Sequence, residues 1–185
     1  KIEISTGRMA GVEALLRWHH PRKGLLSGEE FINAACDCNL IVPIGEWVIA
    51  TACAQAKIWQ DSNEEFAQLP IAVNIAIPQL YADLSKTIQY QLARCNIAPA
   101  SLQLEITESM LIRDLPRATS VLQEISDNGI TIAIDDFGTG YSSLSVLKAL
   151  PIDILKIDQS FINDLGNNTD DSTIVRAIVR MAHAL

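Results

Sequence analysis

The feature that most constrains the fold is a repeated alternation of short apolar strands with helical segments. Strand patterns occur at residues 69–76, 101–107, 130–135 and 152–158, and the first three are bulky on one parity and small or polar on the other. Strands that look buried on both faces and alternate with helices are typical of a parallel sheet. We therefore predict an α/β fold.

Apolar residues at helical spacing predict the segments between these strands. The expected helices are residues 28–38, 44–60, 78–94, 115–128 and 141–150, with a last helix from about residue 172 to the end.

The beginning of the chain has a different pattern. Two apolar runs, residues 2–4 and 9–18, are joined by the turn residues 5–8. A connection this short cannot be a parallel crossover, so we expect the two runs to pair antiparallel. Residues 19–24 are expected to form a loop.

Five strands place a polar or charged residue on their less bulky parity or at their carboxyl end, namely Glu13, Asn74, Glu105, Asp135 and Lys156. In a closed (β/α) barrel, that parity lines the interior and the carboxyl ends carry the site. A doubly wound open sheet is the alternative. It would need a glycine-rich nucleotide loop after its first strand, and residues 7–11, GRMAG, are not such a loop.

Asp136 and Asp158, at strand ends, complete this set. All of its candidate ligand atoms are oxygens. Hard cations such as Mg²⁺ or Mn²⁺ prefer oxygen, whereas zinc prefers histidine or thiolate. Asp135 and Asp136 together could serve two ions a few ångströms apart, and two-metal sites support phosphodiester cleavage. The set therefore predicts a two-metal site.

Two cations accompany these oxygens. Lys156 would polarise a water or offset phosphoryl charge, and Arg17 would hold a phosphate through two hydrogen bonds. Structural roles remain open: Lys156 could form a buried salt bridge with Asp158 or Asp135, and Asn74 could be a hydrogen-bonded core amide.

Composition narrows the partners and the location. The net charge of −8 over 185 residues disfavours binding to DNA, RNA or anionic membranes. No run of 18 apolar residues is present, so no transmembrane helix is predicted. The four cysteines lack zinc spacing and are expected to be reduced thiols of a cytoplasmic protein.

Several motifs carry a family resemblance. They are EALLRW with Glu13, AVNIA with Asn74, LEITES with Glu105 and Glu108, DDFGTGYSSL from Asp135, and LKID with Lys156. In order and spacing they resemble the EAL domain family of cyclic di-GMP phosphodiesterases, over essentially the whole chain.

The resemblance implies a TIM-like (β/α) barrel with one antiparallel strand, and metal-dependent hydrolysis of cyclic di-GMP to linear pGpG in bacterial signalling. A complete barrel takes about 250 residues. We therefore expect residues 1–185 to be a truncated EAL domain with about six of eight strands. The start of the first strand and the last two strands, with a catalytic glutamate, would be missing.

The resemblance also implies a role for each matching residue. Glu13, Asn74, Glu105 and Asp135 would hold the first metal, and Asp135 and Asp136 the second. Lys156 and Asp158 would position the nucleophilic water, Glu108 would support the DDFGTGYSSL loop, and Arg17 and Leu15 would contact substrate. Residues 137–143 would couple dimerisation to metal binding.

A homodimer is implied, as are upstream sensor or diguanylate cyclase (GGDEF) domains in a parent protein, which another domain could anchor to a membrane. A receptor that binds cyclic di-GMP without cleaving it, or a regulatory protein-binding module, are the alternatives. Every visible metal ligand is intact, which favours the enzyme.

Overall fold

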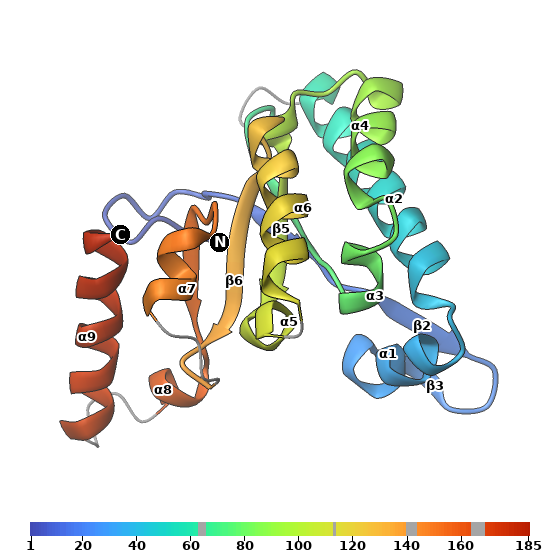
Figure 1. Cartoon of the computed structure of the whole chain (residues 1–185). Coiled ribbons are helices and arrows are strands. Elements are labelled where there is room, and N and C mark those ends of the chain that lie inside the picture. The colour runs from blue at the N-terminus through green and yellow to red at the C-terminus, as the bar shows by residue number, and fades with distance from the viewer. Residues whose placement is uncertain (63–65, 113, 140–143, 164–168) are drawn as a thin grey trace.

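A parallel sheet is the centre of the computed structural model, which describes residues 1–62, 66–112, 114–139, 144–163 and 169–185. Five strands lie in the order β1-β4-β5-β6-β7, so neighbours in the sheet follow one another along the chain (Figure 1). They are β1 (Val12–Ala14), β4 (Ile71–Asn74), β5 (Leu102–Thr107), β6 (Thr131–Phe137) and β7 (Ile154–Ile157). This is an incomplete α/β barrel, and the predicted fold class is confirmed.

The central strands form because their side chains are buried on both faces. Leu104, Ile106 and Ile134 are fully buried on one parity. The opposite parity carries small residues such as Ala72 and Ala133, which are also fully buried. Each fully buried leucine or isoleucine contributes about 1.5–3 kcal/mol. The bulky parity therefore makes the core, and the small parity leaves room for polar side chains.

The longer helices cover the bulky face of the sheet. Figure 1 shows α6 in front of β5 and β6, with α4 and α2 on one side and α7 and α9 on the other. Ile49, Ile88 and Leu122 from three of these helices enter the same buried core. The longer helices are α1 (Gly28–Asp37), α2 (Ile41–Ser62), α4 (Leu84–Cys95), α6 (Leu115–Asp127), α7 (Leu144–Ala149) and α9 (Thr169–Ala184).

Short helical turns follow several strand ends. They are α3 (Ile77–Leu80), α5 (Glu108–Ile112) and α8 (Ser160–Asn163), whereas the 3₁₀ turn Pro99–Ser101 directly precedes β5. The predicted single helix at residues 78–94 is therefore wrong. It is two helices, because Asp83 between them adopts a left-handed conformation with φ 50°. The turn α5 was not expected.

The start of the chain also differs from the prediction. The expected single strand at residues 9–18 is divided into β1 and β2 (Arg17–His20), and β2 pairs antiparallel with β3 (Gly24–Ser27). The expected loop at residues 19–24 is thus partly the turn of this hairpin. The antiparallel pairing of the first two runs is reduced to one bridge, Ile2 with Met9. The sheet of the described residues has five strands beside that bridge, rather than six.

Helix α2 has a property that the sequence reading did not expect. By length and composition it is apolar enough to cross a membrane, although 33% of its apolar 18-residue stretch is buried inside the structure. Core helices pass the same test, and Ile49 and Cys53 of α2 belong to the buried core. The four cysteines are free thiols.

Candidate functional site

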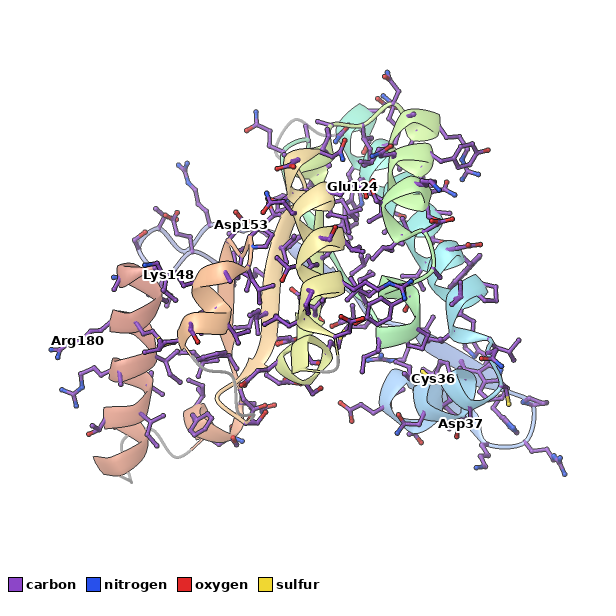
Figure 2. All side chains as sticks on the ribbon, in the orientation of Figure 1. Cys36, Asp37, Glu124, Lys148, Asp153 and Arg180 are labelled. Atoms are coloured by element: carbon purple, nitrogen blue, oxygen red, sulfur yellow. The ribbon has the colours of Figure 1, made fainter. Side chains whose placement is uncertain are left out.

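The polar residues predicted from strand parity meet on the small face of the sheet, near the carboxyl ends of the strands. Asn74 lies opposite Glu105 in the register of β4 and β5, and Thr107 lies opposite Asp135 in the register of β5 and β6. Asp153 is at the other end of the sheet (Figure 2), where its carboxylate accepts a hydrogen bond of 2.8 Å from the Ile132 amide.

Three carboxylates form the centre of the site. Glu13, Glu105 and Asp135 each offer an oxygen within 4.8 Å of the other two. The Asn74 amide nitrogen donates to Glu13 Oε1 at 2.8 Å, which places Asn74 beside them. We call Glu13, Asn74, Glu105, Asp135 and Lys156 the inner cluster.

Lys156 lies among the three carboxylates. Its Nζ is 2.5 Å from Glu105 Oε2, 2.7 Å from Asp135 Oδ2 and 3.7 Å from Glu13 Oε2. Burial by itself lowers the pKa of the Lys156 ammonium, but the hydrogen bonds to Asp135 and Glu105 and the charges of these residues outweigh it. The pKa of Lys156 is therefore raised, and the side chain is charged at neutral pH.

Glu105 is the most buried member, with 1% of its surface exposed. A carboxylate at this depth has to be paired and hydrogen-bonded. Its Oε1 accepts hydrogen bonds from Lys1 Nζ at 2.6 Å and from Gln103 Nε2 at 3.0 Å, while Lys156 covers Oε2. The structure thus surrounds Glu105 with two ammonium groups and an amide.

A second group, Asp136 and Asp158, lies at the ends of β6 and β7, and we call it the outer pair. Burial, followed by the negative charges of Asp135 and Asp158, raises the pKa of Asp136. Asp158 has the opposite shift. The Ser160 hydroxyl, at 2.5 Å, and the Ser160 amide, at 2.9 Å, donate to its carboxylate and lower its pKa.

Glu108, which is 3% exposed, contacts the loop after β6. The Gly138 amide donates to Glu108 Oε2 at 3.4 Å. This contact joins Glu108 to the loop, and its supporting role stays a prediction. Of the predicted regulatory segment, residues 137–139 are described, and residues 140–143 lie outside the described part.

Leu15 and Arg17 lie beside Glu13 at the edge of the inner cluster. Together with Glu13 they line a pocket of about 400 Å³ between β1 and α2, which Trp47 and Trp59 also line. The Arg17 guanidinium donates to the carbonyl of Leu16 at 2.8 Å, and it forms no ion pair with the described residues. Its charge remains open to an anionic group.

This donor set fits a hard divalent cation. Glu13, Glu105 and Asp135 offer carboxylate oxygens and Asn74 offers an amide oxygen, which are donors that Mg²⁺ and Mn²⁺ accept. An acidic group that could hold a metal is thus present.

Three contributors to the site were missed by the sequence reading. Gln103 lies two residues before Glu105 on the same parity, so the strand pattern could have indicated it. Ser160 follows Asp158 at the spacing of a side-chain turn. Lys1 contacts Glu105 across 104 positions of sequence, and no local pattern indicated it.

The fold and the site together define a class of protein: an incomplete α/β barrel with an acidic cluster at its strand ends. Comparison with known protein families identifies this class. The family model of the EAL domain matches residues 1–185, and the chain belongs to the EAL domain family. The resemblance seen in the motifs is confirmed.

A curated relative from Pseudomonas aeruginosa, the bifunctional diguanylate cyclase/cyclic di-GMP phosphodiesterase MucR, is 45% identical over 186 residues. The match covers 100% of this chain and 27% of MucR. The chain spans between 21% and 29% of the length of the curated relatives that it matches.

Two solved structures are similar over 99% of this chain, each with a TM-score of 0.92. The PaMucR phosphodiesterase in complex with c-di-GMP is 44% identical, and the match covers 74% of that chain. The EAL enzyme Bd1971 with cAMP and cyclic-di-GMP bound is 29% identical, and the match covers 50% of that chain.

Proposed function

We propose that this chain is part of a metal-dependent phosphodiesterase that hydrolyses cyclic di-GMP to linear pGpG. The single observation that carries the proposal is the meeting of Glu13, Glu105 and Asp135 around Lys156 in an EAL domain. The similarity to the cyclic di-GMP phosphodiesterase MucR and to its complex with c-di-GMP supports the same substrate.

The metal ions would be Mg²⁺ or Mn²⁺. Glu13, Asn74, Glu105 and Asp135 would hold the first ion, and Asp135 and Asp136 the second. Such ions lower the pKa of a bound water and neutralise charge that develops on the phosphoryl group.

The chain's own side chains would orient the reaction. Lys156 holds Glu105 and Asp135 in position by hydrogen bonds of 2.5 and 2.7 Å. Lys156 and Asp158 would position the attacking water, since Lys156 lies on β7 and Asp158 directly follows the end of that strand. Arg17 would bind a substrate phosphate, and Leu15 would offer an apolar contact in the neighbouring pocket.

The setting of the domain belongs to the same proposal. A homodimer that uses residues 137–143 would couple dimerisation to metal binding. Further sensor or diguanylate cyclase domains would supply the input signal, which is consistent with the much greater length of the relatives. The domain itself would act in the cytoplasm.

A receptor that binds cyclic di-GMP without cleaving it is a second candidate. The observation in its favour is that the ammonium groups of Lys1 and Lys156 cover both oxygens of Glu105. A side chain already engaged in this way is a less available metal ligand.

A cleavage assay tests the proposal. A protein that extends this chain to the complete EAL domain is incubated with cyclic di-GMP and MnCl₂ or MgCl₂, and chromatography separates pGpG from the substrate. We expect cleavage that EDTA abolishes, and a loss of more than about a hundredfold in kcat/KM in Asp135→Asn, since this variant keeps the shape but loses the charged ligand. Binding without cleavage would identify a receptor, and near-normal turnover of Asp135→Asn would overturn the metal assignment.

A further inference from the structure

Lys1 reaches the inner cluster from outside the sheet. Its Nζ lies 2.6 Å from Glu105 Oε1, and its side chain is 29% exposed while that of Glu105 is 0% exposed. The backbone fixes this approach, because the Ala10 amide donates to the Lys1 carbonyl at 2.9 Å and Ile2 forms an antiparallel bridge with Met9. Lys1 thus lies alongside the residues that lead into β1.

The two lysines at Glu105 are not equivalent. Lys156 lies within salt-bridge distance of three carboxylates, Glu13, Glu105 and Asp135. The salt bridge of Lys1 is with Glu105. Because Lys1 is tied to one partner and can turn toward solvent, it is the ammonium that a cation approaching Glu105 can displace at the smaller cost.

We infer that Lys1 is a positioning residue that holds Glu105 in the metal-free protein and competes with the metal ion for it, thereby setting the metal affinity of the site. The inference rests on the metal site of the proposed function and deepens it. No sequence motif assigned a role to this residue.

The direction in which Lys1 changes the metal affinity follows from thermodynamic linkage. Lys1 neutralises Glu105 when no metal is bound, so it stabilises the metal-free state. In the metal-bound state the ion supplies that positive charge, and a second cation beside it is repelled. A group that favours one state over the other changes the equilibrium between them, so Lys1 lowers the affinity for metal.

The test compares Lys1→Gln with the unaltered chain by calorimetric titration of Mn²⁺ into metal-stripped protein. We expect Lys1→Gln to bind Mn²⁺ roughly tenfold more tightly or better, since a charge within about 4–6 Å shifts carboxylate equilibria by about 1–3 log units. Lys1→Arg, which keeps the charge, should bind as the unaltered chain does. Lys57→Gln is the matched control, because Lys57 forms an exposed pair with Asp61 on α2.

Thermal melts at a series of Mn²⁺ concentrations provide a second measurement. Lys1→Gln should have a lower Tm than the unaltered chain without metal, and the difference should shrink as Mn²⁺ is added. Such melts report the coupling even for a variant that is unfolded when metal-free, since metal then refolds it.

The outcomes separate the possible failures. A purely structural Lys1 would lower Tm equally with and without Mn²⁺ and leave the affinity unchanged, which would overturn the inference alone. No Mn²⁺ binding by the unaltered chain would overturn the metal site of the proposed function and the inference with it. Tighter binding in Lys1→Gln, with Lys1→Arg and Lys57→Gln unchanged, would support both.

Discussion

The inner cluster and the outer pair lie at the carboxyl ends of neighbouring strands, yet their negative charges are compensated in different ways. In the inner cluster, Glu105 is buried and is matched by the ammonium groups of Lys1 and Lys156. In the outer pair, burial and the like charges of Asp135 and Asp158 raise the pKa of Asp136, and the charge of Lys156 offsets this only in part.

The comparison indicates which region is complete without metal. Two lysines compensate the inner cluster, so it is an integral part of the folded core. The outer pair relies on the hydroxyl and amide of Ser160, which act on Asp158 alone. We therefore expect the inner cluster to contribute to stability, and Asp136 of the outer pair to reduce it until a cation arrives.

The largest effect should come from Glu105→Gln. Breaking a buried ion pair costs about 3–5 kcal/mol, and we expect about 3 kcal/mol here, because Lys1 can turn toward solvent and Asp135 still pairs with Lys156. Urea unfolding of the metal-free protein measures this cost. The same variant should lose cleavage.

The control is Asp61→Asn, which breaks the exposed pair with Lys57 and should cost less than about 1 kcal/mol. If both variants changed the free energy of unfolding by the same small amount, the inner cluster would not be part of the stabilising core.

A smaller effect on stability is expected at Gly138, in the loop after β6. Gly138 has φ +104°, and a Cβ there would lie 2.8 Å from Phe161 Cε2. Gly138→Ala should therefore cost about 1–2 kcal/mol in unfolding free energy. Because the Gly138 amide contacts Glu108, cleavage should also fall.

Gly7→Ala is the matched control for this loop. Gly7 also has a positive φ, +69°, but a Cβ there meets nothing within 4 Å. We expect Gly7→Ala to cost stability through its backbone alone and to leave cleavage unchanged. Equal losses of cleavage in the two variants would contradict a specific role of the loop.

The sequence predicted the inner cluster better than its surroundings, for a physical reason. Strand parity is local, so the pattern at residues 101–107 placed Glu105 on the small face and also located β5 (Leu102–Thr107) to within one residue. The parallel sheet then brings the polar residues of neighbouring strands together without further information.

Other features depend on contacts that no local pattern contains. The hairpin of β2 and β3 was missed because Trp18 continues the apolar alternation of β1. The break between α3 and α4 depends on the left-handed conformation of Asp83, which few residues adopt. The contact of Lys1 with Glu105 is formed by the tertiary fold.

The smallest effect, and the most telling one for the comparison, concerns Asp136→Asn. A raised pKa means that the carboxyl favours its neutral form in the folded state, so ionisation destabilises the fold as pH rises from the usual value of 3.8 through the raised one. At pH 7 the metal-free variant should be more stable than the unaltered chain. The gain should stay below about 1 kcal/mol, because the group is largely exposed, and it should vanish below pH 3.8.

Asparagine suits this position, because it tolerates the backbone φ of 53° that Asp136 has. Asp158→Asn is the contrasting control. The pKa of Asp158 is lowered, so its charge favours the fold above the usual pKa, and its removal should give no gain at pH 7. Urea unfolding at pH 7 and near pH 4 measures both variants. A loss of stability in Asp136→Asn at pH 7 would mean that Asp136 is already compensated, and the distinction between the two regions would fail. With Mn²⁺ present we expect the order to reverse, because under the proposed function Asp136 would then be a metal ligand.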